Sequence, residues 1–301
     1  MRPSIRQLEY LVAVAETLHF RKAAQNCSVT QPALSAQIQQ LEQLLGIQLF
    51  ERNRRRVLLT SAGREAVAHA RQVLDQVDGL ADSARAATEP LTGDLRMGVI
   101  PTVAPYLLPR VLPGLRETRP KLRLFLREEF TNVLVERLNA GELDVLMLAL
   151  PVSGDFDSQL LFHDDFWLAL PEEHELLDHK AVTEDDLRDQ EVLLLEDGHC
   201  LRDQALAICG RSGASESMRV RATSLGTLSQ MVSGGLGLTL LPELAIGVEA
   251  REGSGVRVRP FAEPVPHRQI GLVWRKGSSR ADEFKQLGEE IVQLYDAGQP
   301  K

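Results

Sequence analysis

The chain is poor in cysteine and has no long apolar run. Its 301 residues contain three cysteines, too few for the disulfide framework of a secreted domain. No apolar run approaches the roughly 20 residues that span a bilayer. Charged Arg6, Glu9 and Glu16 interrupt the first apolar pattern, which argues against a signal peptide. We therefore expect a cytoplasmic protein without membrane contact, in a reducing compartment where a disulfide is more often regulatory than structural.

Charge is distributed unevenly along the chain. The formal net charge is −8. Residues 1–60 carry eight arginines and lysines against four glutamates, a net +4, so the remainder carries −12. A small basic head on a large acidic body indicates a nucleic-acid contact at one end. A cluster of arginines favours this interpretation over an ordinary solvated surface: Arg52, Arg54, Arg55 and Arg56.

The first 60 residues predict a winged helix-turn-helix. Helical apolar spacing indicates one helix after Ser4 and a short second helix over about 20–26. Thr30 can cap a third helix. The side chains expected on the buried face of that helix are Leu34, Ile38, Leu41 and Leu45. The residues expected to face DNA from its exposed N-terminal end are Thr30, Gln31, Pro32 and Ser35. Glutamine and serine can hydrogen-bond to base edges, so this helix is the predicted recognition helix.

Two short apolar segments, 47–50 and 57–59, predict a hairpin around residues 53–56. Such a wing places its arginines against phosphates or a minor groove. Residues 61–89 then predict one long helix with a narrow apolar seam: Val67, Ala70, Leu74, Val77 and Ala81. A seam of this kind needs a partner, and a second copy of the chain would also set two recognition helices on a two-fold DNA site. Packing on its own body is the alternative.

From residue 90 onward, predicted strands and helices alternate, which indicates an α/β fold with largely parallel sheets. Short strands are expected, for example over 166–170. The predicted domains are 1–60, 61–89 and 90–301. The last divides into lobe I, about 90–163 plus 268–301, and lobe II, about 164–267. Ligands bind at the carboxyl ends of strands in such folds. Residues that follow a strand and precede a helix are Thr102, Thr131, Cys200 and Ser224.

Cys200 and Cys209 lie nine residues apart in one predicted helix, which follows a buried strand over 192–195 and ends near Cys209, with Gly210 beyond it. Nine helical residues separate their Cα atoms by roughly 13.5 Å. A disulfide requires less than about 7 Å. The two side chains also lie on roughly opposite helix faces. Joining them would require local unfolding of the helix, a change large enough to act as a signal.

The two thiols differ in their expected surroundings. Cys200 falls in the first helical turn, where the dipole and unpaired N–H groups favour a thiolate. His199 and Arg202 are near enough in sequence to add positive charge or a hydrogen bond. Cys209 lies beside the apolar stripe and is expected to be buried. Two ordinary buried cysteines are the alternative, since unpaired cysteine is often buried. Cys27, in the predicted turn, is expected to be a small core residue.

Several segments resemble the LysR-type transcriptional regulators, over essentially the whole chain. These segments are Val29–Ser35, Leu49–Arg52, Ala222–Leu225 and Gly235–Pro242. Longer segments resemble the members of that family that sense hydrogen peroxide: Ile100–Val103, Pro105–Pro109 and Leu195–Gln204, with Cys209. The resemblance implies a winged helix-turn-helix, a linker helix for dimerisation and a two-lobed α/β regulatory domain like the periplasmic binding proteins.

The resemblance also implies a DNA-binding activator of oxidative-stress genes. Cys200 matches the peroxidatic cysteine, which forms a sulfenic acid and condenses with Cys209, the resolving cysteine. The matching peroxide-pocket residues are Thr102, Thr131, His199 and Asp203. The implied partners are promoter DNA, hydrogen peroxide, further copies of the chain in a dimer of dimers, RNA polymerase, and a thioredoxin- or glutaredoxin-type reductant. No cofactor is implied.

Two other functions remain open at this point. A regulator of the same family could respond to a small metabolite in the cleft between the lobes, with the cysteines as bystanders. A thiol peroxidase needs the same groups, but it would leave the basic head and long helix without a purpose, so we expect no enzyme. A metal site is not expected either, because Asp197, His199 and Cys200 are too close in sequence to surround an ion.

Overall fold

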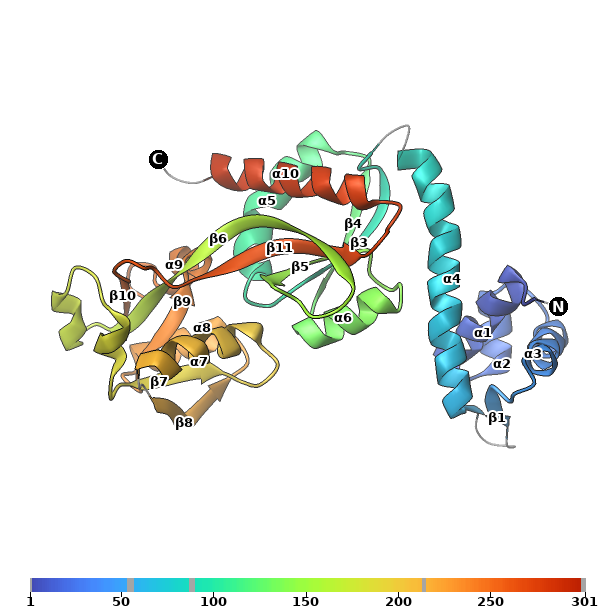
Figure 1. The fold of residues 1–301 in the computed structure, drawn as a ribbon, viewed down its shortest axis with the longest axis horizontal. Helices are drawn as coiled ribbons and strands as arrows, with labels where there is room; N and C mark the ends of the chain where they lie inside the picture. Colours follow the sequence, from blue (N-terminus) through green and yellow to red (C-terminus); the bar gives the residue numbers. More distant parts are fainter. Residues whose placement is uncertain (1, 53–56, 87–89, 213–214, 299–301) are drawn as a thin grey trace. The chain divides into compact units, whose positions relative to one another are not determined.

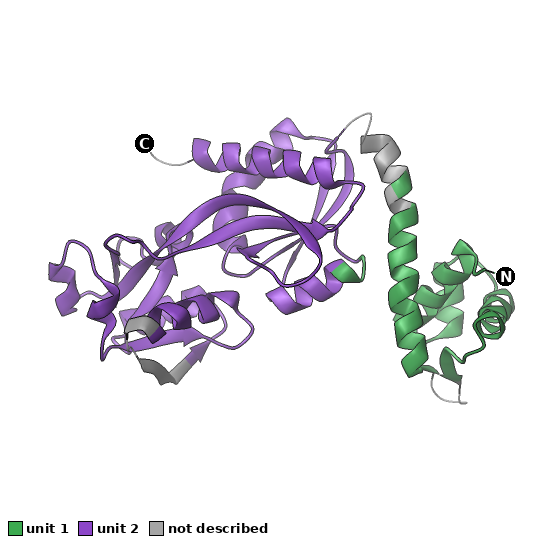
Figure 2. Cartoon of the chain, viewed as in Figure 1, with its two compact units in different colours: residues 1–88, 139–141 green, residues 89–138, 142–301 purple. Residues whose placement is uncertain are grey.

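The computed structural model describes residues 2–52, 57–86, 90–212 and 215–298. It forms two compact units (Figure 2). The first comprises residues 1–88 with 139–141, and the second comprises residues 89–138 with 142–301. Each unit has its own hydrophobic core.

Three helices build the core of the first unit: α1 (Ile5–Thr17), α2 (Phe20–Asn26) and α3 (Gln31–Leu45). Ser4 caps α1 as predicted. Its hydroxyl accepts the Gln7 backbone N–H at 3.2 Å, while the Gln7 side chain accepts the Ser4 N–H at 3.0 Å. Thr30 caps α3 by accepting the backbone N–H of Ala33 at 3.4 Å. The predicted helix-turn-helix is therefore confirmed, and its caps are the residues expected from sequence.

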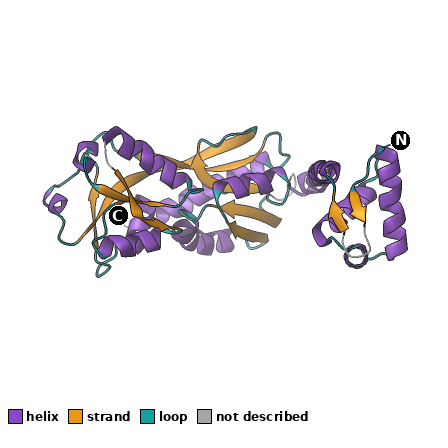
Figure 3. Cartoon of the chain, turned by 90° about the horizontal axis from the view of Figure 1, so that it is seen from below, coloured by secondary structure: helices purple, strands orange, loops and turns teal. Residues whose placement is uncertain are grey.

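The wing is an antiparallel hairpin of β1 (Phe50–Arg52) and β2 (Val57–Leu59) (Figure 3). The hairpin was predicted, but a first strand over 47–50 was wrong. A Glu42 side-chain oxygen accepts the backbone N–H groups of Leu49 and Phe50 at 2.9 and 3.2 Å. These bonds tie the incoming chain to α3, and pairing with β2 begins only at Phe50. Residues 53–56, with Arg54, Arg55 and Arg56, lie outside the described residues.

One predicted core residue of α3 is not buried. Leu45 is 41% exposed, because the helix ends there at Gly46, which has a left-handed φ of 70°. Its side chain instead lines an apolar cavity of about 720 Å³ between α3 and the helix that follows the wing, together with Leu8, Ile47 and Val73.

The helix after the wing, α4 (Ser61–Ala86), changes its surroundings along its length. Val67 and Ala70 are buried against the helix-turn-helix. Farther along, Val73, Val77 and Leu80 are exposed to solvent. Of the predicted seam, the same unit thus covers Val67 and Ala70, Leu74 is half-buried and Val77 is exposed, whereas Val73 and Leu80 lie outside that seam. The Ala81 side chain lies outside the described residues.

A seven-stranded sheet forms the frame of the second unit, in the order β10-β6-β11-β5-β3-β4, with β9 also beside β6. The strands are β3 (Gly93–Val99), β4 (Leu122–Glu128), β5 (Val145–Leu150), β6 (Phe156–Pro171), β9 (Thr239–Pro242), β10 (Val256–Pro260) and β11 (His267–Arg275). β3 is parallel to β4 and β5, whereas β6 and β11 make only antiparallel pairs. The expectation of largely parallel sheets is therefore wrong for this sheet.

The long strand β6 explains the difference. Its first part pairs with β11, and its last part, residues 166–171, pairs with β9 and β10. Figure 1 shows it curving from one part of the unit to the other. The sequence indicated only 166–170, because polar residues interrupt the apolar pattern before Phe166.

A second sheet pairs β7 (Glu191–Leu195) in parallel with β8 (Ser215–Ala222). The helices of the second unit are α5 (Ala104–Thr118), α6 (Thr131–Asn139), α7 (Cys200–Ser212), α8 (Leu225–Ser233), α9 (Glu243–Glu249) and α10 (Ala281–Ala297). α10 packs along α5 and β6, while α7 and α8 pack against β7. A four-residue turn, 196–199, joins the buried strand β7 to the start of α7.

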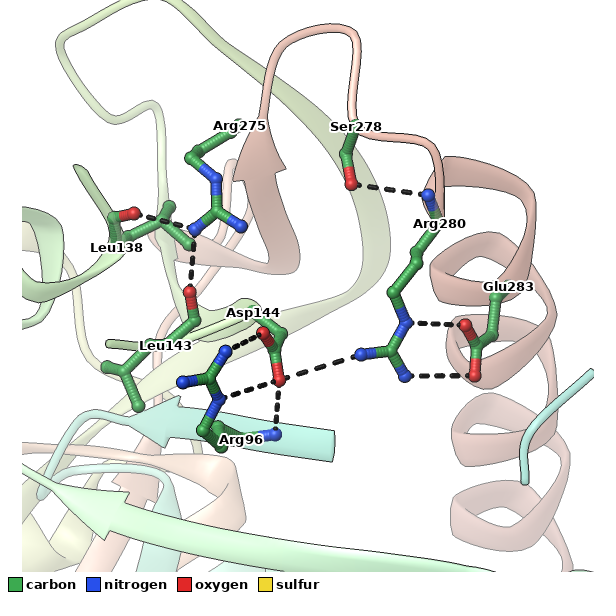
Figure 4. Close-up of polar contacts among 8 residues, drawn as sticks. All are labelled: Arg96, Leu138, Leu143, Asp144, Arg275, Ser278, Arg280 and Glu283. Atoms are coloured by element: carbon green, nitrogen blue, oxygen red, sulfur yellow. Dashed lines mark hydrogen bonds and ion pairs between the residues drawn. The ribbon is translucent and has the colours of Figure 1, made fainter. Parts of the chain in front are cut away.

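An ion cluster fixes the start of α10 against the sheet (Figure 4); its Asp144, Arg280 and Glu283 are buried, whereas Arg96 is exposed. The Asp144 carboxylate accepts the backbone N–H of Arg96 at 2.7 Å and its guanidinium at 2.9 Å. Arg280 lies 3.6 Å from the same carboxylate and donates to Glu283 at 2.7 Å. Each charge has an opposite partner, so the desolvation cost of burial is offset.

Candidate redox site and DNA-contacting surface

Both cysteines of interest lie in α7, and the structure holds both as thiols. The helix continues to Ser212, so the predicted end near Cys209 was wrong. Gly210 lies inside the helix on its exposed face, and a Cβ at this position would meet no atom within 4 Å. Nine residues of unbroken helix place the two Cα atoms roughly 13.5 Å apart. A bond between the thiols therefore requires α7 to unwind.

The environments of the two thiols differ as predicted. Cys209 is 3% exposed and belongs to the main core. Burial raises the pKa of its thiol to about 11, which keeps it protonated at neutral pH. Cys200 is half-buried at the first position of α7, packed against the edge of that core. Of the pair, Cys200 is the thiol that a small molecule can reach.

The turn between β7 and α7 is held in a fixed shape. Gly198 adopts a φ of +103°, which favours glycine. The Arg202 side chain pairs with Asp197 at 2.9 Å and donates to the carbonyl of Leu195 at 3.2 Å. The Arg202 guanidinium is thus paired with Asp197. Through these two contacts the arginine stabilises the turn that precedes Cys200.

His199, next to Cys200, is 4% exposed. One ring nitrogen bonds to the backbone of Thr223, while Nε2 is buried and has no hydrogen-bond partner among the described residues. Burial lowers the pKa of His199, and this effect outweighs the Thr223 bond and the nearby Glu196, which raise it. The ring is therefore neutral at pH 7. Of the two roles left open by the sequence, it offers a hydrogen bond rather than a positive charge, with Nε2 as acceptor.

Two further buried polar atoms near this turn lack partners among the described residues. They are the hydroxyl oxygen of Thr131, the first residue of α6, and the side-chain carbonyl of Gln204 in α7. α6 meets the turn through the contact of Phe130 with His199. Unsatisfied buried polar atoms are rare, so several in one place indicate a site for water or a small polar ligand. Sequence analysis missed Gln204, although its i+4 spacing from Cys200 places both on one helix face.

Thr102 is held by a buried network that sequence analysis also missed. Arg268 donates to the Thr102 hydroxyl at 2.8 Å and to its carbonyl at 3.0 Å. The same guanidinium pairs with Asp164 at 2.8 Å, and the other Asp164 oxygen accepts the Leu244 N–H at 3.0 Å. Because arginine only donates, the Thr102 oxygen accepts there and its own proton can donate elsewhere. Arg268 and Asp164 are opposite each other in β11 and β6, a pairing visible only once strand register is known.

Two other predicted residues, Asp203 and Ser224, lie near helix N-termini. Asp203 is exposed in the first turn of α7, unlike the buried Thr102 and His199. Its carboxylate there complements the positive end of the helix dipole. Ser224 caps α8 by accepting the Thr227 N–H at 3.2 Å.

The predicted DNA-contacting residues gather at the start of α3. Thr30, Gln31 and Pro32 are exposed, and Ser35 is half-buried one turn later. Arg52 lies in β1 of the wing. In the part of the chain that the structure describes, no helix is long and apolar enough to cross a membrane. Nor does any group of three His, Cys, Asp or Glu side chains among those residues form a metal site.

Comparison with known proteins places the chain in a family. Residues 5–64 match the bacterial regulatory helix-turn-helix of the lysR family, and residues 88–295 match the LysR substrate binding domain. The chain is 47% identical to the DNA-binding transcriptional dual regulator OxyR of Escherichia coli K12, over 97% of this chain and 96% of that protein.

Solved structures give the same result. One is a full-length Pseudomonas aeruginosa OxyR with a cysteine-to-aspartate substitution (TM-score 0.82, 34% identity, 97% of this chain and 95% of that one). Another is a cysteine-to-serine mutant of Corynebacterium glutamicum OxyR in its H2O2-bound form (TM-score 0.69, 36% identity, 99% and 94%). The chain belongs to the LysR family of bacterial transcriptional regulators.

Proposed function

We propose that this protein is a cytoplasmic transcriptional regulator of oxidative-stress genes that senses hydrogen peroxide through Cys200 and Cys209. One observation carries the proposal. The two thiols of one helix differ in burial, and the more accessible one, Cys200, follows His199 and lies one helical turn before Gln204. The buried Nε2 of His199 and the buried side-chain oxygen of Gln204 have no partner among the described residues. The similarity to OxyR proteins, one of them described as H2O2-bound, supports the same ligand.

In the first step, the Cys200 thiolate attacks one oxygen of the peroxide. An S–O bond forms, the O–O bond breaks, and the departing hydroxide takes a proton to become water, which leaves a sulfenic acid. The proposed pocket comprises Thr102, Thr131, His199 and Asp203, and we include Gln204 because its buried side-chain oxygen has no partner among the described residues. The threonine hydroxyls donate hydrogen bonds to the peroxide oxygens, and Nε2 of neutral His199 accepts a hydrogen bond from a peroxide O–H. Arg268 keeps the Thr102 hydroxyl in place.

In the second step, the Cys209 sulfur attacks the sulfur of Cys200. The S–S bond forms, and the sulfenic hydroxyl leaves with the thiol proton as water. α7 must unwind first, because the intact helix keeps the thiols too far apart. Unwinding also exposes Cys209 and removes the burial that raises its pKa. Disulfide formation thus couples a chemical event to loss of a helix.

The structural change reaches DNA through the rest of the chain. The residues at the start of α3 and the arginines of the wing contact the operator. α4 joins two chains in a dimer, and two dimers form a tetramer. The division into domains 1–60, 61–89 and 90–301, with two lobes in the last, belongs to this proposal. So do contacts with RNA polymerase and re-reduction by a thioredoxin- or glutaredoxin-type protein. No cofactor is needed, and one oxidation per cycle makes the protein a switch rather than an enzyme.

The test is DNA footprinting of the reduced and the peroxide-treated protein on promoter fragments. We expect different footprints for the two forms of the wild type, and one unchanging footprint for Cys200→Ser. Cys27→Ser, which removes the third cysteine, should behave as wild type. Identical footprints for both wild-type forms would contradict the proposal. A Cys200→Ser, Cys209→Ser protein that still responds to an inducer would instead favour a metabolite ligand.

A further inference from the structure

The Phe130 ring covers the segment that leads into Cys200. Phe130 directly precedes α6, and its carbonyl accepts the Leu134 N–H at 2.9 Å, which fixes its backbone at the start of that helix. Its ring meets the His199 ring edge-on, with centroids 4.5 Å apart and an interplanar angle of 68°. Its ring carbons also lie 3.4 Å from the point where a Cβ would stand on Gly198. A Cβ at position 198 would therefore be in ordinary van der Waals contact with the ring, and it is the φ of +103° that favours glycine there.

The two rings have unequal access to water. His199 is almost fully buried, whereas Phe130 is half-buried. The phenylalanine is therefore part of the apolar cover that separates the histidine from solvent. The other ring nitrogen of His199 is occupied by Thr223, so the ring is held from two sides and Nε2 remains the acceptor.

We propose that Phe130 is a positioning residue for the peroxide reaction, which keeps the His199 ring dry and oriented so that Nε2 can accept a hydrogen bond from peroxide beside Cys200. The inference rests on the proposed function of Cys200. Phe130 acts through its contact with His199. An imidazolium has no acceptor nitrogen, so wetting and protonation of the ring would remove the hydrogen bond on which this step depends.

The charged groups around His199 are few. Glu196 raises its pKa from within the same turn, Asp197 and Arg202 pair with each other there at 2.9 Å, and Cys200 follows His199 in sequence. On the side of α6, Phe130 and Thr131 are uncharged, and Glu129 pairs with Arg127 at 3.5 Å. On the side of β8, the contact is the Thr223 backbone. Loss of the Phe130 ring should therefore raise the pKa of His199 toward its ordinary value.

The experiment compares three full-length variants with the wild type: Phe130→Ala, Phe130→Leu and Phe125→Ala. Phe125 is an exposed phenylalanine of β4 and serves as the matched control. Rates of Cys200 oxidation by hydrogen peroxide are measured by stopped flow across pH 5–8, a range chosen around the ordinary histidine pKa of about 6.5. Alkylation of the same thiol by iodoacetamide is measured in parallel, and the His199 ring is titrated by NMR.

For Phe130→Ala we expect peroxide oxidation to slow roughly three- to tenfold between about pH 5.5 and 6, where a ring of ordinary pKa is largely protonated, and to slow less at neutral pH. The acidic limb of its rate profile should move to higher pH together with the His199 titration, while alkylation is not slowed. Phe130→Leu, which keeps an apolar cover, should recover most of the rate, and Phe125→Ala should match the wild type.

Three outcomes overturn the inference. If the wild-type Cys200 does not react with peroxide, the proposed function fails and the inference falls with it. If the wild type reacts but Phe130→Ala keeps both its rate and its His199 titration, the inference alone fails. If peroxide oxidation and alkylation slow equally in both the alanine and the leucine variants, Phe130 has only a structural role.

Discussion

At the scale of single residues, a difference in burial gives two chemically identical thiols different properties. Cys209 sits in the core with a raised pKa, and Cys200 stands at the accessible start of the same helix. Cysteine spacing made the pair visible in the sequence. The polar atoms around it were harder to predict, because Arg268 acts through a partner 104 residues away in sequence. Gln204 could have been found by its spacing from Cys200, but burial of its carbonyl needs the fold.

The raised pKa of Cys209 predicts a stability change at alkaline pH. The folded state holds the thiol protonated up to about pH 11, whereas the unfolded thiol ionises near 9.0. The stabilisation is complete below pH 9 and is lost as pH rises through 11. Wild-type unfolding free energy should therefore fall more steeply between pH 9 and 11 than that of Cys209→Ala, by ~2 kcal/mol. The unfolding free energies are measured by urea denaturation at several pH values. The same pH dependence for both proteins would refute the prediction.

The buried pair of Arg268 and Asp164 predicts a large effect of removing one partner. Arg268→Met leaves the Asp164 carboxylate buried without its main partner, which should cost about 3–5 kcal/mol of stability. Arg268→Met combined with Asp164→Leu should recover much of that loss, because neither charge remains. Chemical denaturation of the single and double variants measures both. A double variant less stable than the single one would show that the pair is not the source of the loss.

At the scale of elements, α7 is the part of the fold that must come apart. Its start and the preceding strand could be predicted from an apolar run followed by a polar turn. Its end could not, because Gly210 is a common stop signal and here lies inside the helix. The first part of β6, and with it the antiparallel pairing, was missed because three consecutive polar residues, 163–165, interrupt the apolar pattern before Phe166. Caps such as Ser4 and Thr30, which depend only on local sequence, were predicted correctly.

Gly210 gives a direct test of the unwinding step. An alanine Cβ there meets no atom within 4 Å, so Gly210→Ala should stabilise α7 by about 0.5–1 kcal/mol. The reduced form, with its intact helix, gains this stabilisation, whereas the oxidised form with a broken helix does not. Converted to an equilibrium constant, the gain should shift the redox equilibrium about two- to fivefold toward the reduced form. Equilibration in thiol–disulfide buffers, followed by mass analysis, measures the shift.

Gly247 is the matched control, because it is also a helical glycine with open space around its Cβ position, but in α9. Gly247→Ala should leave the redox equilibrium of the cysteine pair unchanged. A shift of equal size in both variants, or in neither, would argue against unwinding of α7 as part of disulfide formation.

At the scale of the whole molecule, the chain combines a DNA-contacting module with a redox-active one, and α4 carries apolar side chains that its own unit leaves exposed. Leu80 is 74% exposed, and Val73 and Val77 precede it on the same helix. A narrow exposed apolar stripe of this kind favours helix pairing between chains. Of these three residues, the seam predicted from the sequence contained only Val77, and the sequence could not show which turns the helix-turn-helix covers.

Leu80→Glu should therefore disrupt self-association, because the new carboxylate would be buried in the pair. Sedimentation velocity should show smaller species for this variant than for the wild type at equal concentration. Val248→Glu, at an exposed apolar residue of α9, tests whether any added charge has this effect. Wild-type assembly in Leu80→Glu would rule out the stripe on α4 as the contact.

The central claim is that peroxide joins the two cysteines of α7. The most direct measurement is peptide mass mapping of the reduced protein after addition of stoichiometric hydrogen peroxide. The account predicts a rapid intramolecular link between Cys200 and Cys209, with Cys27 unmodified. Survival of both α7 thiols under these conditions, or a link that involves Cys27 instead, would contradict it.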